Sequence, residues 1–505
     1  MTLISRLVGF VRDMVIAVTF GATGVTDAFF VAFRIPNLLR RMFAEGAFAQ
    51  AFVPVFTEYR KQRSRDELID LTDHVTGTLL ILLSLITAAG VLLAPLLILL
   101  FAPGFSGDPD KQALATWMLR ITFPYALFIS LTALAGGILN SFGKFAVPAF
   151  TPVFLNLCMI AAALWLAPLL DTPVTALAWG VFAAGIVQLA FQIPALWKIG
   201  LIPRPRFKRA HEGVKRITKL MIPALFGSSV AQVNMLLNTI LASFLVSGSI
   251  SWLYFSDRFV ELPLALFGIT LSTVILPKLS SEHATDDPQA FSNTLDWGLR
   301  LGITIALPAM LGLMLLSTPI IATLLQYQAF TAHETRMVAI ALSVYAIGLP
   351  GFVLVKILAP GFYARQDTAT PVRIGIIAIA ANIVMYGIIV IPWILLDGPA
   401  PHAALAFCAA FASFINATLL FRKLRALGVY QPGNAWKQLL PRILLACAIM
   451  SITLLLLTPA AERWEQWSIP LRGGTLAGLI SSAALIYLSS LRLLGIKPRD
   501  LLVNR

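Results

Sequence analysis

Residues 5–59 read SRLVGFVRDMVIAVTFGATGVTDAFFVAFRIPNLLRRMFAEGAFAQAFVPVFTEY, two apolar stretches that carry charged side chains in their interiors. A charged side chain at the centre of a bilayer costs roughly 2.5–3.5 kcal/mol on insertion scales, so such residues are rare in membrane helices and usually functional. The charges within or between these stretches are Arg6, Arg12, Asp13, Asp27, Arg34, Arg40, Arg41 and Glu45. Their presence predicts a membrane protein in which these side chains have a role.

The rest of the chain is as apolar as this region. Of its 505 residues, 58% are hydrophobic and only 12% are charged, which excludes an ordinary soluble protein. Apolar runs of about 20 residues, enough to cross a hydrocarbon core about 30 Å thick, recur throughout. We predict an all-α polytopic membrane protein with about fourteen transmembrane helices. The predicted segments are 3–22, 26–58, 75–103, 112–140, 148–169, 173–197, 217–246, 251–277, 293–325, 336–361, 372–394, 402–421, 438–458 and 473–493.

Basic residues concentrate in the connections after even-numbered segments and in the C-terminal tail, which predicts that both termini are cytoplasmic. The longest polar connection follows the sixth segment and reads LIPRPRFKRAHEGVKRITK at 201–219. It suggests a division into two six-helix lobes. We predict an N-lobe with helices 1–6 over 1–200, a basic cytoplasmic linker over 201–216 and a C-lobe with helices 7–12 over 217–425. Helices 13 and 14 and a cytoplasmic tail would occupy 426–505.

Two pairs of prolines support an internal repeat. Pro54 and Pro277 each lie near the end of a long predicted helix, 223 residues apart, and the same offset separates Pro148 from Pro371. An offset of six helices, an even number, would place the two lobes in the same sense across the membrane. The sequence therefore predicts a parallel pseudo-repeat, with chance matching of prolines as the alternative.

The second predicted helix has a charged stripe. At 100° per residue its members are Asp27, Arg34, Arg41 and Glu45, with Asn37 near the edge. Such a stripe must face protein or water rather than lipid. Because Pro36 removes a backbone hydrogen bond, we expect the helix to turn there, which leaves the register of Arg40 open.

The eighth predicted helix has a comparable face, formed by Tyr254, Asp257, Arg258 and Glu261 at i, i+3, i+4 and i+7. Internal ion pairs that lock the bundle are one interpretation of both charged helices. Taken together, however, the apparent intramembrane cations outnumber the anions; they are Arg6, Arg12, Arg34, Arg40, Arg41, Arg120, Arg258 and Lys356. A surplus of buried positive charge favours an anionic ligand, and the planar fork of arginine fits phosphate or pyrophosphate.

Other functional classes lack their signatures. The sequence has no G-x-x-x-x-G-K-[ST] motif, so we expect no ATP hydrolysis. Its five histidines are scattered, and we predict neither a metal site nor a histidine-based catalytic system. The net charge of +14 comes from basic residues whose distribution matches that of a membrane protein's cytoplasmic loops, so no nucleic-acid partner is expected. We therefore predict that the protein is not an enzyme.

Four segments together resemble one family. They are SRLVGFVRD at 5–13, TDAFFVAFRIPNLLRRMFAEGAFAQAFVPVFTEY at 26–59, SWLYFSDRFVELP at 251–263 and KILAPGFYARQDTATPV at 356–372. They resemble the MurJ (MviN) lipid II flippases of the MOP exporter superfamily, and the resemblance extends over essentially the whole chain. It implies fourteen helices, two lobes around a central cationic cavity, and a groove of helices 13 and 14 for a polyprenyl tail.

The resemblance also implies a function. Such a protein would move lipid II, the undecaprenyl-pyrophosphate-linked disaccharide-pentapeptide, to the outer leaflet of the bacterial inner membrane by alternating access, for peptidoglycan synthesis. No cofactor is implied, and the driving force would be the membrane potential or an ion gradient. Its partners would be lipid II, membrane lipids and the cell-wall synthesis machinery, and it would act as a monomer.

The family's pyrophosphate-binding arginines correspond by motif to Arg6, Arg12, Arg40 and Arg258, to which we add Asp27 as an acidic partner. Further candidates for cavity or gating residues are Asp13, Arg34, Asn37, Arg41, Glu45, Tyr254, Asp257 and Glu261.

Two alternatives stay open within the superfamily. One is an exporter of another polyprenyl-linked glycan, and the other is a drug or cation antiporter. An antiporter should use buried carboxylates with few arginines, which the cation surplus argues against. A non-transporting scaffold for cell-wall assembly would tolerate the loss of Arg12 or Arg258.

Overall fold

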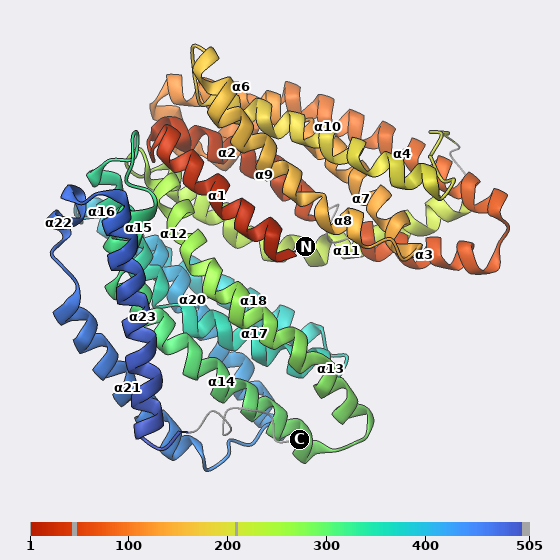
Figure 1. The fold of residues 1–505 in the computed structure, drawn as a ribbon. Coiled ribbons are helices and arrows are strands. Elements are labelled where there is room, and N and C mark those ends of the chain that lie inside the picture. Colours follow the sequence, from red (N-terminus) through yellow and green to blue (C-terminus); the bar gives the residue numbers. More distant parts are fainter. Residues whose placement is uncertain (1, 43–47, 208–210, 497–505) are drawn as a thin grey trace. The chain divides into compact units, whose positions relative to one another are not determined.

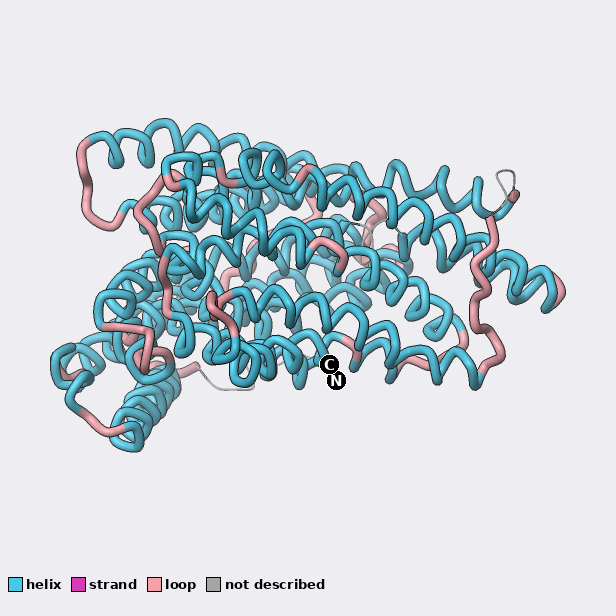
Figure 2. The backbone as a smooth tube through the Cα atoms, turned by 90° about the horizontal axis from the view of Figure 1, so that it is seen from above, coloured by secondary structure: helices cyan, strands magenta, loops and turns pink. Residues whose placement is uncertain are grey.

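The computed structural model describes residues 2–42, 48–207 and 211–496. Helices joined by short loops make up this described part of the chain, which contains no strand (Figure 2). The prediction of an all-α polytopic membrane protein is confirmed. Glu45, one of the predicted cavity residues, lies outside the described residues.

The chain forms two compact units, each with its own packing. Unit 1 comprises Met1–Ser251 and Gln328–Phe330, and unit 2 comprises Trp252–Tyr327 and Thr331–Arg505. The helix α11 packs on α3 and α4 and so belongs to unit 1. These units do not test the predicted repeat, and the lobe boundaries derived from it stay predictions.

Most α-helices of unit 1 are labelled in Figure 1. The helices of this unit are α1 (Thr2–Phe20), α2 (Gly24–Arg40), α3 (Phe48–Gln62), α4 (Arg65–Leu92), α5 (Ala94–Phe101), the 3-10 helix η2 (Pro103–Gly107), α6 (Pro109–Thr122), α7 (Tyr125–Ser141), α8 (Ala146–Phe150), α9 (Pro152–Ala161), the π-helix η3 (Ala162–Leu166), the 3-10 helix η4 (Ala167–Leu169), α10 (Thr175–Lys198) and α11 (Glu212–Ser243).

The helix α12 (Ser249–Pro263) begins in unit 1 and continues into unit 2. The further helices of unit 2 are the π-helix η5 (Leu264–Ile269), α13 (Thr270–Ala284), α14 (Pro288–Leu315), α15 (Ser317–Leu324), α16 (Ala332–Ala346), α17 (Leu349–Tyr363), α18 (Ala369–Met385), the π-helix η6 (Tyr386–Val390), α19 (Ile391–Leu395), α20 (Pro401–Ala426), α21 (Trp436–Leu457), α22 (Ala461–Gln466) and α23 (Ile469–Leu493).

Each of the fourteen predicted segments coincides with one or more of these helices. Between α4 and α5 the predicted segment is broken at a short turn, and Pro95 lies in the first turn of the new helix. Within the described residues, ten helices are long and apolar enough to cross a membrane, or eleven if the bent pair α16 and α17 counts as one span. The charged helix α1 is not among them, because Arg6, Arg12 and Asp13 lie within it.

Close helix packing in both units depends on small residues. In unit 1, a Cβ at Gly180 of α10 would lie 2.8 Å from the Cβ of Ala162. In unit 2, a Cβ at Gly348 or Gly351 would lie within 3 Å of α20 atoms of Ala410 or Ser413. Small residues let membrane helices approach closely enough for dispersion contacts and weak hydrogen bonds, which replace the hydrophobic driving force in lipid.

Unit 1 also has an apolar core that joins α3, α4, α7 and α11. Phe52, Phe56, Leu71 and Ile138 are completely buried within it. The rings of Phe48, Phe52 and Phe56 contact one another along one face of α3, with successive centroids 5.1 and 5.2 Å apart. This core fixes α3 and the start of α4, next to the charged helix α2.

Candidate functional site

The charged pair of α1 is buried inside unit 1. Arg12 donates to Oδ1 of Asp13 from Nε (3.0 Å) and from Nη2 (2.6 Å), and its Nη1 donates to Oδ1 of Asn156 on α9 (2.9 Å). The amide of Asn156 donates in turn to the carbonyl of Ser5 at 3.2 Å. The Arg12 and Asp13 side chains are only 8% and 5% exposed. The pair therefore holds α1 against α9 as well as carrying charge.

The carboxylate of Asp27 is bonded to several groups from other parts of unit 1. It lies in the first turn of α2 and accepts hydrogen bonds from the backbone N–H groups of Gly248 (2.7 Å) and Ser251 (2.8 Å) and from the Ser251 hydroxyl (2.6 Å). Ser249 begins α12, so the carboxylate caps the N-terminus of that helix, where the helix dipole favours negative charge.

A lysine completes the surroundings of Asp27. The ammonium of Lys111 on α6 lies 3.3 Å from Oδ2 of Asp27, and the two side chains are 9% and 2% exposed. The same ammonium lies over the Phe105 ring, 4.4 Å from its centroid. Asp27 thus joins α2, α6 and the start of α12 within unit 1.

The rest of α2 presents arginines that are only partly buried. Nη1 of Arg34 donates to the Thr239 hydroxyl of α11 at 2.6 Å. Arg34 follows Asp27 by seven residues, about two helical turns, so both lie on the same face of α2. Arg40 donates from Nε to Oδ1 of Asn37 at 2.9 Å. The helix does not turn at Pro36 as expected; it continues to Arg40, and π-helical bonding follows at 41–42. Arg41, directly after α2, is also half-buried, whereas Arg6 on α1 is exposed.

The predicted face of α12 forms in unit 2. Nη1 of Arg258 donates to Oε2 of Glu261 at 2.6 Å, and Nη2 donates to the Tyr254 hydroxyl at 3.3 Å. The guanidinium also lies 4.9 Å from the centre of the Tyr254 ring. The Arg258 side chain is 29% exposed and that of Glu261 is 51% exposed, and Asp257 is exposed as well. A guanidinium so placed can accept a further anion.

The predicted residues therefore form two groups. Arg12 and Asp27 are buried and bonded to partners on other helices of unit 1, and Asp13 is buried against Arg12. The partly exposed arginines Arg34, Arg40 and Arg258 have hydrogen-bonded partners but keep part of their surface accessible. Chemically, the first group can fix helix positions, and the second can bind an anionic group.

Sequence patterns did not reveal the partners of Asp27, Arg12 and Arg34 on other helices. Lys111 lies 84 residues from Asp27, Asn156 lies 144 residues from Arg12, and Thr239 lies 205 residues from Arg34. None belongs to a local charge pattern. Lys111 and Asn156 are isolated polar residues near or within apolar segments. That isolated polarity was the one sequence signal that could have marked them as partners of buried charges.

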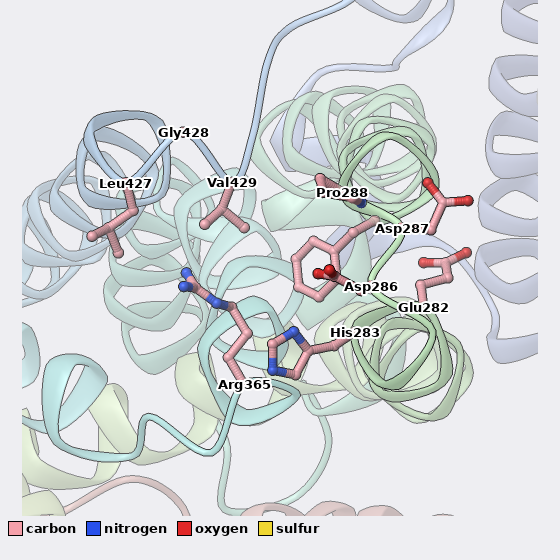
Figure 3. A pocket seen from close by; sticks show the side chains of 10 residues that line it. Glu282, His283, Asp286, Asp287, Pro288, Arg365, Leu427, Gly428 and Val429 are labelled. Carbon is pink, nitrogen blue, oxygen red and sulfur yellow. The ribbon is translucent and has the colours of Figure 1, made fainter.

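A separate cavity of about 300 Å³ lies in unit 2, where α13, α14 and α20 end or begin (Figure 3). Arg365 and His283 lie next to each other in it, whereas Glu282 and Asp287 point away from Arg365. Asp287 caps α14 by accepting from the N–H of Ala290 at 2.9 Å. The residues that line this cavity include none of the predicted site residues, so it adds nothing to the candidate site.

Comparison with known families and sequences gives one consistent result. A family model described as lipid II flippase MurJ matches residues 16–473. A probable lipid II flippase MurJ of Vibrio cholerae serotype O1 is 46% identical over 508 residues, which cover 99% of this chain and 95% of that protein.

Solved structures agree. A lipid II flippase MurJ in an inward closed conformation superposes with a TM-score of 0.81 at 27% identity, covering 99% of this chain and 98% of that one. An inward-facing multidrug resistance transporter of the MATE family, in the MOP superfamily, has a TM-score of 0.68 at 15% identity over 85% of this chain and 96% of its own. The second likeness concerns the fold alone.

Proposed function

Because this chain belongs to the MurJ family of lipid II flippases, which are transporters and not enzymes, we propose that it moves lipid II from the inner to the outer leaflet of the bacterial inner membrane. The substrate is undecaprenyl-pyrophosphate-linked disaccharide-pentapeptide, the precursor of peptidoglycan. The names of its relatives and its similarity to a MurJ structure over nearly the whole chain support this assignment.

The proposed mechanism is alternating access with arginines binding the pyrophosphate. The observation that carries this proposal is that membrane helices α2 and α12 both present guanidinium groups that are only partly buried, at Arg34, Arg40, Arg41 and Arg258. Keeping such groups in apolar helices is costly unless an anion or a protein acceptor meets them. Pyrophosphate oxygens accept the paired N–H groups of arginine bidentately, in short charge-assisted hydrogen bonds.

Within this mechanism, the two groups of residues have different tasks. Arg40 and Arg258 bind the pyrophosphate, together with the exposed Arg6. Arg12 was predicted as a binding residue from motif, and Asp27 was added as an acidic partner. Their bonds to Asn156, Lys111 and Ser251 support a positioning role for both in the conformation described here. Release of these bonds in another conformation would be one step of the transport cycle.

The driving force is the membrane potential or an ion gradient, and both termini are cytoplasmic. With the cell interior negative, moving one negative charge outward gains about 2.3 kcal/mol per 100 mV. An anionic pyrophosphate therefore favours outward movement without any nucleotide. The protein acts as a monomer and delivers lipid II to the cell-wall synthesis machinery.

The test is lipid II exposure on the outer leaflet of cells depleted of their own flippase and supplied with this chain. Exposure should be restored by the parent and by Arg425→Ala, an arginine exposed at the end of α20. Arg258→Ala should lower exposure at least about tenfold at equal membrane levels, since a hydrogen bond to a charged group contributes about 1.5–3 kcal/mol. Arg258→Lys should restore part of it, because lysine keeps the charge but not the fork.

Normal lipid II exposure with Arg258→Ala would contradict pyrophosphate binding by this arginine. Failure of the parent chain to restore exposure would contradict lipid II as the substrate. The similarity to a MATE-family fold makes a drug or cation antiporter the second candidate. Export of cationic dyes by the parent, with no lipid II exposed, would favour that candidate; dye export is expected to be absent.

A further inference from the structure

We propose that Asp70, His74 and His211 form a binding site for a divalent transition metal of the zinc class. These residues lie in unit 1, at the start of α4 and just before α11, and none was predicted as a site residue. One ligand atom from each lies within 4.8 Å of the others. The sequence analysis predicted no metal site, because His74 and His211 are 137 positions apart in the sequence.

The local geometry matches what such an ion requires. Nε2 of His211 lies 3.2 Å from Oδ2 of Asp70. Two ligands at about 2.0–2.1 Å from a tetrahedral zinc ion are about 3.3 Å apart, so these two atoms are already at a suitable separation. Asp70 and His74 are four residues apart on α4 and therefore share a face. With three protein ligands, water would fill the fourth position.

The rings of the two histidines stack with centroids 4.8 Å apart and an angle of 21° between their planes, so the side chains from α4 and from the residue before α11 lie against each other. A metal ion binds histidine in its neutral form. Nδ1 of His74 is 2.8 Å from the Asp70 carbonyl. A carbonyl only accepts, so this contact places the proton on Nδ1 and leaves the lone pair on Nε2 for an ion.

The segment before His211 is already seated on α4. Oδ1 of Asp73 accepts from the N–H of Arg204 at 2.7 Å, and the N–H of Arg206 donates to the Asp73 carbonyl at 3.1 Å. A Cβ at Gly77 would lie 2.0 Å from the Arg206 carbonyl oxygen, so only glycine lets this segment pass so close to the helix. His211 is therefore brought to α4 by contacts that need no metal, which lowers the entropic cost of binding one.

An ion can reach this position from solvent. The Asp70 side chain is 47% exposed, and it also lines a cavity of about 870 Å³ with Asp66 and Asp73. These carboxylates would attract a cation. The side chains of His74 and His211 are 9% and 12% exposed, so the nitrogen ligands are sheltered and the carboxylate is the accessible one.

The experiment uses the full chain, purified in nanodiscs with a tag that contains no histidine. Co²⁺ is the probe, because a tetrahedral site with nitrogen ligands gives visible absorption bands, and Zn²⁺ is then added as a competitor. We expect one Co²⁺ per chain with tetrahedral bands, displaced by Zn²⁺. His74→Asn and His211→Asn should each weaken binding at least about tenfold, as loss of a coordinating group does.

The matched control is His283→Asn, an exposed histidine in unit 2, which should bind as the parent does. Asp70→Asn changes the most exposed of the three ligands, so it is the variant least expected to affect folding. It should also weaken Co²⁺ binding. Absence of the bands in the parent, or equal binding by the parent and all three ligand variants, would overturn the proposal.

Discussion

The charges of α1 and α2 in unit 1 and those of α12 in unit 2 look alike in the sequence but differ in the structure. Asp27 accepts four hydrogen bonds from residues 84 to 224 positions away, and Arg12 donates to Asn156, 144 positions away. Arg258 instead donates to Glu261 and Tyr254 on its own helix. A charge bonded to distant helices supports the fold, whereas the bonds of Arg258 to Glu261 and Tyr254 can be exchanged without disturbing it.

The energetic reason is solvent exposure. Removing one member of a buried charged pair leaves the other unpaired in a low dielectric, which costs about 3–5 kcal/mol. An exposed pair contributes about 0–1 kcal/mol, because water can replace the lost partner.

Asp27→Ala should destabilise the protein most, by about 3–5 kcal/mol, because it leaves the Lys111 ammonium without its carboxylate and two backbone N–H groups without acceptors. The measurement is thermal unfolding in detergent, together with the amount of folded protein in the membrane. Asp286→Asn, at an exposed aspartate in the turn before α14, is the control and should unfold as the parent does. Unfolding of Asp27→Ala at the parent temperature would show that this carboxylate has no structural role.

Arg12→Ala should cost about 3 kcal/mol, since Asp13 stays buried without its partner. Replacing both residues, as Arg12→Met with Asp13→Leu, should recover most of that loss, because two apolar side chains of similar size need no pairing. Unfolding free energies of the single and double variants form a cycle that measures the coupling. A double variant no more stable than Arg12→Ala would mean that the contact to Asn156 is the important one.

Arg258→Ala should change the free energy of unfolding by less than about 1 kcal/mol, because its partner Glu261 is 51% exposed and lies on the same helix. The same variant should nevertheless lose lipid II exposure in the cell assay. Both measurements are needed on one preparation. If stability and exposure fell together, as for Asp27→Ala, the distinction between the two regions would not hold.

Asp367→Ala should have the smallest effect, about 0.5 kcal/mol, the low end for loss of a helix cap. The Asp367 carboxylate accepts from the N–H of Thr370 at 3.0 Å, and hydrogen bonding to Thr370 holds the pKa of Asp367 below its usual value. A lowered pKa stabilises the folded state above the ordinary aspartate value of about 3.9, and that contribution is lost as pH falls through the folded pKa. The difference between parent and variant should therefore persist at pH 7 and vanish at strongly acid pH.

The fold could be predicted from the sequence because hydropathy alone marks helices that must cross a bilayer. All fourteen predicted segments coincide with one or more of the described helices. The effect of Pro36 was misjudged, since α2 continues through it to Arg40 and π-helical bonding follows at 41–42. A proline removes one hydrogen bond, and neighbouring helices can compensate for that loss in a membrane.

Helical periodicity predicted the contacts of the candidate site that lie within one helix, but not those between helices. Spacing placed Tyr254, Arg258 and Glu261 on one face, and the structure has them in contact. The same reasoning could not find Lys111 or Asn156, because a contact between helices distant in sequence leaves no local pattern. The roles of the predicted residues in substrate binding stay predictions.

The partners of Asp27 also determine the order in which this protein can be assembled. The ribosome adds about 5–20 residues per second, so Lys111 is synthesised about 4–17 s after Asp27 and Ser251 about 11–45 s after it. During that interval, α2 is present without the groups that stabilise its carboxylate. The carboxylate of such an early helix must be hydrated or held by the insertion machinery until α12 is made, so the charge that secures the finished fold delays the insertion of its own helix.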